Sequence, residues 1–267
     1  MKFSLKIMGT ASAMPISDRN PSAQMLEVHG RFFLLDCGEG TQKQMRRMHL
    51  PFLKVEAIFI THIHGDHLFG LFGLLNSMAM YGRTGKLDIY GPAALGNILA
   101  FYRNWFGEGT LFEIAFHPLS CKGLEKVHTS KWVTVSAFPL KHKIECYGFR
   151  FDEIVTERHM QENPAYVADS YAYCSDTMPF DELPGYVRGV RALYHEATYQ
   201  EEMADKARDR FHSTTAQAAK CAAEAGAGRL IVGHYSSRIT DFEAYIAECR
   251  AVFPDTVAAQ DGDVFEI

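Results

Sequence analysis

One short segment near residue 60 constrains this chain more than any other part of its sequence. Residues 55–60 are almost continuously apolar, as in a buried strand, and the chain then continues with Thr61-His62-Ile63-His64-Gly65-Asp66-His67. Four side chains that can bind metal thus lie within six residues, on a loop between a strand and a helix. His62 and His64 can reach one ion, and Asp66 and His67 a second. A polar surface turn is the alternative, but it rarely takes this form directly after an apolar strand.

Two neighbouring cations need further ligands, and three later segments offer them at the ends of expected strands. His142 follows the strand that begins at Trp132, Asp176 follows the strand that ends at Ser175, and His234 follows the strand from Arg229. Any one of these residues alone is more typical of a cap or a turn. Ligands gather at the carboxyl ends of strands in layered α/β folds, so the series favours a metal site. Seven candidates exceed the needs of one tetrahedral zinc, which predicts two ions about 3.5 Å apart.

The rest of the chain alternates between expected strands and helices. Strands are expected at Lys2–Met8, Gln24–Val28, Arg31–Asp36, Val55–Ile60, Leu87–Tyr90, Trp132–Phe138, Gly148–Phe151, Ala172–Ser175, Ala192–Tyr194 and Arg229–Val232. Helices are expected at Thr41–Met48, Leu68–Tyr81, Ala93–Trp105, Gln200–Arg210, Thr214–Ala225 and Asp241–Phe253. No linker rich in Pro, Ser or Gly divides the chain. We therefore expect residues 1–267 to form a single α/β domain.

Composition excludes several classes of protein. With 47% hydrophobic residues the chain can bury a large core, and its longest apolar stretch, 68–80, is too short and too interrupted to cross a bilayer. The alternating pattern of residues 1–15 predicts a strand rather than the apolar region of a secretory signal, and the six cysteines form no CxxC pair, so we expect a soluble cytoplasmic protein with reduced thiols. A net charge of -5 weighs against nucleic acid binding, although local positive charge can override it. Candidate basic surfaces contain Lys43, Arg46, Arg47, Lys122, Lys126, Lys131, Lys141 and Lys143.

The successive metal motifs resemble those of the metallo-β-lactamase superfamily along the whole chain. This resemblance implies the metallo-β-lactamase fold, a four-layer αββα sandwich with two mixed sheets. It also implies a division of the ligands. One ion takes His62, His64 and His142, the other takes Asp66, His67 and His234, and Asp176 bridges them. The expected cofactor is two zinc ions, with manganese or another divalent metal as an alternative.

A narrower set of motifs resembles the tRNase Z family. The set consists of Gly9-Thr10-Ala11-Ser12-Ala13-Met14-Pro15, Arg19-Asn20-Pro21-Ser22, Asp36-Cys37-Gly38-Glu39-Gly40-Thr41-Gln42, His195-Glu196-Ala197-Thr198, His212-Ser213-Thr214-Thr215 and His234-Tyr235-Ser236-Ser237-Arg238. The two motifs that begin at His195 and at His212 discriminate most between branches of the superfamily. The resemblance implies an endoribonuclease that removes the 3′ trailer of precursor tRNA and leaves a 3′-hydroxyl. It also implies a homodimer in which the arm of one subunit serves the active site of the other.

Phosphodiester cleavage needs an activated water, positive charge around the phosphate and a proton for the departing oxygen. Asp66 is expected to accept the proton of the water. By the resemblance, Glu196 and His212 form the proton-donating pair, because a carboxylate raises the pKa of its histidine and fixes the tautomer. A helix-capping and core hydrogen-bond set is the alternative for these two residues.

Three more residues are candidates for contact with the substrate phosphate. Ser213 or Thr214 would cap the helix that runs to Ala225, so that free N–H groups face a phosphate, and Arg238 would add a bidentate contact. An ordinary surface arginine is the alternative for Arg238. Asp36 is expected to satisfy buried amides beside the metal loop rather than to react.

One departure from the family pattern affects the substrate. Bacterial members of the tRNase Z family usually carry a long arm between the motifs matched by His142 and Asp176, and this arm clamps the tRNA elbow. Here only about thirty residues intervene, so the arm is expected to be short or missing between 143 and 175. Two alternatives therefore stay open. One is a phosphodiesterase of the same fold for small or generic diesters, and the other is a non-catalytic, metal-stabilised RNA-binding module.

Overall fold

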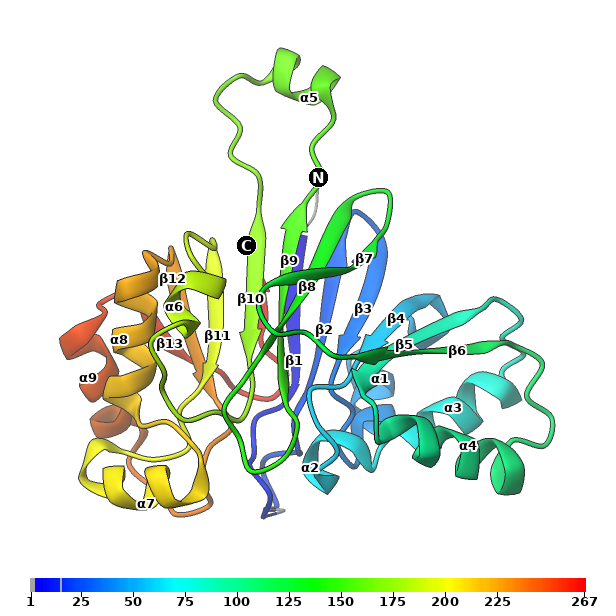
Figure 1. Cartoon of the computed structure of the whole chain (residues 1–267), viewed down its shortest axis with the longest axis horizontal. Helices are drawn as coiled ribbons and strands as arrows, with labels where there is room; N and C mark the ends of the chain where they lie inside the picture. Colours follow the sequence, from blue (N-terminus) through cyan, green and yellow to red (C-terminus); the bar gives the residue numbers. More distant parts are fainter. Residues whose placement is uncertain (1–2, 15) are drawn as a thin grey trace.

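The computed structural model describes residues 3–14 and 16–267, and its centre is a pair of β-sheets packed face to face (Figure 1). The first sheet consists, in spatial order, of β14 (Val264–Glu266), β1 (Phe3–Gly9), β2 (Ala23–Val28), β3 (Arg31–Leu35), β4 (Val55–Phe59), β5 (Leu87–Pro92) and β6 (Ile114–Leu119). The second consists of β13 (Thr256–Ala258), β12 (Arg229–Gly233), β11 (Ala192–Glu196), β10 (Ser170–Cys174), β9 (Tyr147–Glu153), β8 (Val133–Pro139) and β7 (Glu125–Thr129).

Both sheets are mixed. In the first sheet β14, β1, β2 and β3 pair antiparallel, and β3, β4, β5 and β6 pair parallel. In the second sheet β7 to β10 pair antiparallel, and β10 to β13 pair parallel. The parallel strands of both sheets therefore bring their carboxyl ends, and the loops that follow them, to one end of the sandwich.

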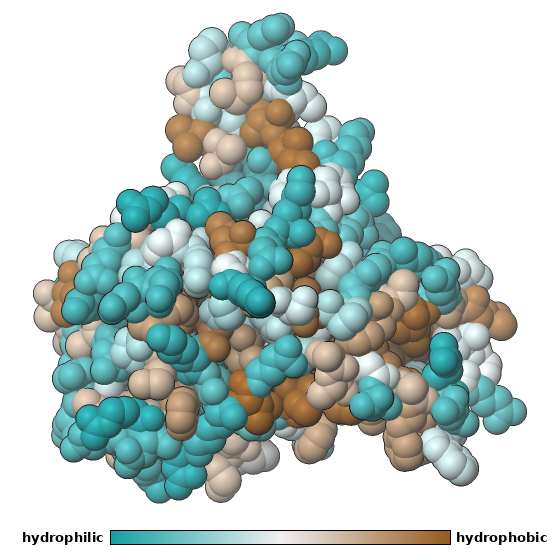
Figure 2. All heavy atoms as spheres, viewed as in Figure 1, coloured by the Kyte–Doolittle hydropathy of each residue, from teal (hydrophilic) through white to brown (hydrophobic). Residues whose placement is uncertain are grey.

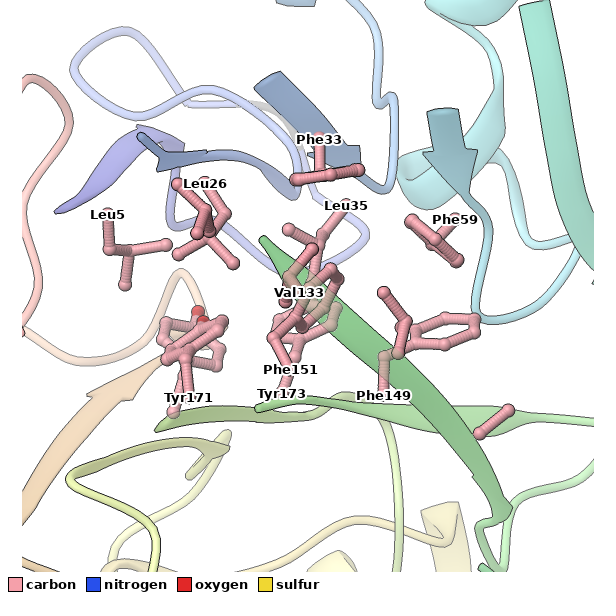
Figure 3. Packing of buried hydrophobic residues seen from close by; sticks show 14 of the residues in the cluster. Leu5, Leu26, Phe33, Leu35, Phe59, Val133, Phe149, Phe151, Tyr171 and Tyr173 are labelled. Carbon is pink, nitrogen blue, oxygen red and sulfur yellow. The ribbon is translucent and has the colours of Figure 1, made fainter. Parts of the chain in front are cut away.

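The core between the sheets is built from side chains that alternate along each strand. Phe33 of β3 and Tyr171 and Tyr173 of β10 point into this layer, together with Phe149 and Phe151 of β9 (Figure 3). Each fully buried phenylalanine contributes roughly 2–3 kcal/mol of transfer free energy. The neighbouring residues of the same strands point outward and are also buried, which explains the nearly continuous apolar runs in the sequence.

Helices cover the outer face of each sheet. The first sheet carries α1 (Thr41–Arg47), α3 (Leu71–Met80) and α4 (Leu95–Phe106), and the second carries α6 (Leu183–Tyr186), α8 (Thr215–Ala225) and α9 (Phe242–Val252). Two outer apolar clusters join these helices to their sheets. The expected four-layer αββα sandwich with two mixed sheets is confirmed.

Most of the expected elements form within one or two residues of their expected ends. The expected first strand starts at Lys2, which lies outside the described residues, as does Pro15 of the opening motif. The single helix expected at Leu68–Tyr81 is wrong, because the chain forms α2 (Gly65–Leu68) and then α3. Gly70 separates them and donates its N–H to Cys37 O (2.9 Å), and a Cβ there would lie 2.0 Å from Gly38 O.

A short protrusion joins β9 to β10 and rises from one end of the sandwich (Figure 1). It consists of residues 154–169 and contains α5 (Glu157–Glu162). Glu153 holds its base, since the carboxylate accepts hydrogen bonds from Tyr166 Oη (2.8 Å) and from the N–H of Asp169 (2.9 Å) and lies 2.6 Å from Nε2 of His29. Because β9 leads into the protrusion and β10 leads out, the loops of His142 and Asp176 lie at the opposite end of both strands.

Two further properties concern the whole described chain. None of its described helices is long and apolar enough to cross a membrane. All six cysteines are buried and free.

Candidate metal centre and active site

The loops at the carboxyl ends of the strands form the site. The His62–His67 segment follows β4, Asp176 follows β10, His234 follows β12, and His142 lies between β8 and β9. Glu196 ends β11. The structure therefore brings together all seven residues that the sequence suggests as metal ligands.

The first group of potential ligands consists of three histidines and one carboxylate oxygen. Nε2 of His62 lies 3.0 Å from Nδ1 of His64, which lies 3.2 Å from Nε2 of His142. Oδ2 of Asp176 lies 3.6 Å from Nε2 of His62 and 3.7 Å from Nε2 of His142. All four ligand atoms lie within 4.8 Å of one another.

The second group lies on the other side of Asp176. Nε2 of His67 and Nε2 of His234 are 3.3 Å apart, and Oδ2 of Asp66 lies 3.4 Å from the first and 3.3 Å from the second. Oδ1 of Asp176 lies 3.4 Å from His67 Nε2 and 3.2 Å from His234 Nε2. The two oxygens of one carboxylate thus face different groups of ligands.

Both groups fit a divalent metal. Ligand atoms about 2.0–2.1 Å from a tetrahedral zinc lie roughly 3.3 Å from each other, close to the separations found here. Oδ1 of Asp176 is buried and has no hydrogen-bond partner in the described chain, which is costly unless a cation satisfies it. Burial lowers the pKa values of His62, His64 and His142 and so favours the neutral imidazoles that bind metal.

Asp36 fixes the orientation of the second group. Its Oδ2 accepts a hydrogen bond from Nδ1 of His67 (2.8 Å), which leaves Nε2 with a lone pair directed at the ligand cluster. Its Oδ1 accepts the buried N–H of Thr61 (2.8 Å), and Tyr173 Oη donates to Oδ2 (2.9 Å). The expectation that Asp36 satisfies a buried amide is confirmed.

Two other imidazoles are oriented by oxygens outside the ligand groups. Nδ1 of His142 lies 3.0 Å from the carbonyl oxygen of Phe211, which ends α7 (Ala204–Arg210) in a left-handed conformation. Nδ1 of His234 lies 2.9 Å from Oγ1 of Thr198. In each ring Nε2 is the nitrogen that remains for a metal.

Glu196 and His212 form a close pair beside these groups. Nδ1 of His212 lies 2.9 Å from Oε1 of Glu196, and Nε2 lies 4.0 Å from Oδ2 of Asp176. Burial lowers the pKa of His212, but the charges of Glu196 and Asp176 and the hydrogen bond to Glu196 outweigh it and raise the pKa to about 9. The pair therefore has the geometry of a carboxylate-held proton donor.

Glu196 is fully buried and accepts several hydrogen bonds. Its oxygens accept the N–H groups of Thr177 (3.1 Å), Thr198 (2.9 Å) and Ser213 (3.0 Å). Burial raises the pKa of Glu196, yet the charge and hydrogen bond of His212 lower it below the usual value overall. The carboxylate is thus held in place from three segments of the chain.

Ser213 and Thr214, which the sequence suggests as phosphate contacts, have hydrogen-bond partners within the chain for their hydroxyl and N–H groups. Both residues are fully buried, the Ser213 hydroxyl donates to Thr177 O (2.8 Å), and the Thr214 N–H donates to Gln217 Oε1 (3.0 Å). Thr214 does begin α8 as its cap, with Gln217 completing a capping box. The N–H groups of Thr214, Thr215 and Gln217 at this helix terminus are hydrogen-bonded within the chain.

A cleft of about 500 Å³ opens over the site. It is lined by Ser12, Ala13, Met14, His64, Asp66, His142, Lys143, Asp176, Thr198, Tyr199, Lys206, Arg210, His212, His234, Ser236, Ser237 and Arg238. Arg238 lies there as the sequence suggests. Lys206 and Arg210 were missed, although their spacing of four residues on an expected helix directly before His212 predicts cations on one helix face.

Comparison with known proteins agrees with this geometry. Residues 31–235 match the model of the beta-lactamase superfamily domain. Ribonuclease Z of Bacteroides fragilis is 34% identical to the chain over an alignment that covers 97% of each protein. The crystal structure of the short form of human tRNase Z superimposes with a TM-score of 0.82 at 28% identity and covers 98% of both chains. A long-form RNase Z from yeast has the same fold, with a TM-score of 0.82 at 17% identity over 99% of this chain and 42% of its own. The chain therefore belongs to the ribonuclease Z family of the beta-lactamase superfamily.

Proposed function

We propose that this chain is an endoribonuclease that removes the 3′ trailer of precursor tRNA and leaves a 3′-hydroxyl on the tRNA. The observation that carries the proposal is the Glu196–His212 pair directly beside two groups of metal ligands. Near full-length similarity to ribonuclease Z proteins supports the same activity.

In this proposal two zinc ions occupy the site. His62, His64 and His142 would hold one ion, Asp66, His67 and His234 would hold the other, and the two carboxylate oxygens of Asp176 would serve both. When bound, the ions would supply positive charge to the phosphate and would lower the pKa of the attacking water, so that it loses a proton readily. The mixture of imidazole and carboxylate donors suits zinc, and manganese is the alternative.

The side chains around this site move the protons. Asp66, whose Oδ2 faces the second group, accepts the proton of the attacking water. His212 donates a proton to the ribose oxygen that leaves, while Glu196 holds the ring by its Nδ1. Arg238 on the cleft wall binds a phosphate oxygen.

The activity is tested on two substrates, with and without a chelator. We expect metal-loaded protein to cut precursor tRNA at its 3′ end, to hydrolyse bis(p-nitrophenyl) phosphate slowly, and to lose both activities with the chelator. Hydrolysis of the chromogenic diester without cleavage of precursor tRNA would favour a small-molecule phosphodiesterase. Binding of RNA without turnover on either substrate would favour a non-catalytic module.

The short protrusion is expected to limit the affinity for folded tRNA. Residues 154–169 contain one arginine and three carboxylates, so they offer little attraction to RNA phosphates. Contacts remote from the scissile bond position a substrate, and we expect roughly a hundredfold lower kcat/KM for precursor tRNA than in a relative with a long arm. The rate on a small phosphodiester should be comparable, because the metal ligands and the proton donor are unaffected.

Grafting a long arm between Arg158 and Ala168 provides the measurement. The graft should restore tRNA processing without changing the rate on the small diester. Equal processing of precursor tRNA by the ungrafted chain and an arm-bearing relative would contradict the argument. The surface of Lys122, Lys126 and Lys131 would then be the candidate for holding the tRNA.

We propose that two copies of the chain form the active species. The protrusion rises from the end of the sandwich opposite α2 and α7 (Figure 1), so the protrusion of one copy is placed to approach a substrate in the cleft of a second copy. The lobe of α3 and α4 exposes apolar side chains, seen as brown and tan surface, whereas the lobe of α7 and α8 is mostly hydrophilic (Figure 2). The exposed apolar residues of the lobe that contains α3 and α4 are Met80, Tyr81, Phe101, Trp105, Phe106 and Leu111.

Light scattering after gel filtration tests the dimer. The unmodified chain should have twice the monomer mass, and Trp105→Glu should shift it to the monomer because a charge in an apolar interface loses its hydration. Lys220→Glu on α8, in the opposite helical layer, is the matched control and should stay dimeric. A monomeric unmodified chain, or a dimer that tolerates Trp105→Glu, would rule out this interface.

A further inference from the structure

Lys206, Arg210 and Arg238 line the cleft together with one aromatic side chain, Tyr199. Lys206 Nζ lies 5.6 Å from the centroid of the Tyr199 ring. Arg210 and Arg238 line the same cleft as Tyr199, and their positive charges oppose the rise that burial causes in the pKa of Tyr199. Tyr199, Lys206, Arg210 and Arg238 thus form one basic wall of the cleft.

This basic wall is the wall that carries His212. The rings of Tyr199 and His212 are 6.1 Å apart, and α7, with Lys206 and Arg210, ends directly before His212. Asp66 of α2 also lines the cleft, and α2 lies apart from α7 in Figure 1. Apart from Lys206, Arg210 and Arg238, Lys143 beside His142 is the one lysine or arginine among the described residues that line the cleft.

Lys206 and Arg210 are available to bind an anion. Neither forms an ion pair with a carboxylate in the described part of the chain, whereas Arg208 between them pairs with Asp205 (2.8 Å) and does not line the cleft. The helix therefore directs its two unpaired cations toward the cleft and neutralises the third. A helix surface that faces only solvent would need no such difference between the cations that line the cleft and the cation that does not.

The identity of the leaving oxygen fixes the direction of the RNA, if the function proposed above is correct. Cleavage that leaves a 3′-hydroxyl on the tRNA releases the O3′ atom of the nucleotide upstream of the scissile phosphate. His212 protonates that oxygen, so the upstream nucleotide must lie against the wall of His212. Its own 5′-phosphate is then the nearest anion to the basic wall.

We propose that Lys206 and Arg210 form a subsite for the RNA phosphates immediately upstream of the scissile bond. The strand accordingly crosses the cleft with its tRNA side along α7 and its trailer along the side of α2. Phosphates bound here hold the 3′ end of the tRNA in line with the site, so the contacts serve orientation as well as affinity.

Neutral phosphate analogues test the subsite one linkage at a time. The substrates are precursor tRNAs in which a methylphosphonate at a 2′-deoxynucleotide replaces either the first linkage upstream of the cut or the first linkage downstream of it. The enzymes are the metal-loaded unmodified chain, the double variant Lys206→Gln/Arg210→Gln, and Arg208→Gln as the matched control on the same helix. The value measured is kcat/KM at several salt concentrations.

For the unmodified chain and for Arg208→Gln, we expect the upstream analogue to lower kcat/KM roughly tenfold. On the native RNA, the kcat/KM of the double variant should be at least tenfold below that of the unmodified chain. The upstream analogue should lower the kcat/KM of the double variant almost no further. The plot of log kcat/KM against log salt concentration should be shallower by about 0.7 for each lost contact. Such non-additivity shows that the side chains and that phosphate act on each other. Lys206→Gln alone should give the same pattern at smaller size.

Two results would overturn the subsite. If the double substitution and the upstream methylphosphonate lower kcat/KM independently, so that their effects multiply, Lys206 and Arg210 do not contact that phosphate. If their effects are instead non-additive for the downstream methylphosphonate, the RNA strand crosses the cleft in the opposite direction. A failure of the proposed function is distinguishable from both, because the unmodified chain would then not cut native precursor tRNA at all.

Discussion

Replacement of Asp176 by alanine is expected to reduce the metal content at both sites and to lower turnover about ten-thousandfold. Oδ1 of Asp176 faces His67 and His234, and Oδ2 faces His62 and His142, so the substitution removes an oxygen from each group at once. The rate falls about tenfold for each 1.4 kcal/mol of transition-state stabilisation that is lost, and metal ions supply several kcal/mol of it. Metal analysis by mass spectrometry after dialysis gives the occupancy, and precursor tRNA gives the rate.

Asp181→Ala is the control for this substitution, since Asp181 is an exposed carboxylate further along the same loop. It should retain both ions and normal turnover. Two ions retained at full occupancy in Asp176→Ala would sink the assignment of the bridge, and loss of a single ion would make Asp176 a ligand of one site alone.

The variant His212→Ala is expected to keep its metal and to lose roughly two to four orders of magnitude in turnover, the usual range for a positioned proton donor. Its Nδ1 is held by Glu196, and its Nε2 lies 4.0 Å from Asp176 on the cleft side of the ligand groups. The loss should depend on the substrate. A ribose oxygen leaves poorly without a proton, whereas p-nitrophenolate leaves without one, so bis(p-nitrophenyl) phosphate should be much less affected.

Equal losses on the two substrates would remove His212 from the role of acid and make it a contact for the phosphate. A fall in metal content would instead make it a ligand, which the grouping of His212 with Asp176 and His234 also allows. Metal analysis of the variant separates these outcomes from the expected one.

Sequence periodicity predicted the buried strands and amphipathic helices because each buries a continuous face. It missed β6, β7, β13 and β14. The last two are three-residue strands whose pairing rests on main-chain bonds to β12 and β1, and β7 is an edge strand with exposed Glu125 and Lys126. Elements of this kind leave little side-chain pattern, so tertiary pairing alone defines them.

The site shows the same division between local pattern and tertiary contact. The spacing of the seven ligand candidates and their positions at strand ends predicted that they lie together, because the topology of a mixed sheet collects such loops at one end of the sandwich. Sequence could not reveal that the hydroxyls of Thr214 and Thr215 bind Glu201 and Glu248. Glu248 of α9 also accepts the N–H of Glu201 (3.0 Å), and so it ties the start of α8 to the turn after Glu196. Such contacts between distant segments follow from the assembled fold.

The closed base of the protrusion has a consequence for how such a chain can change over evolution. Glu153 and Asp169 face each other across β9 and β10, with a main-chain hydrogen bond of 3.0 Å, so both ends of the segment are fixed before it leaves the sheet. Doubling the length of a loop with fixed ends costs only about 0.6 kcal/mol. The alignment with the Bacteroides fragilis protein spans 296 positions against the 267 residues of this chain, so that relative carries segments absent here. Insertion or deletion at this base can therefore change the length of the protrusion at a small cost in stability, while the ligand residues at the opposite end of the sandwich keep their places.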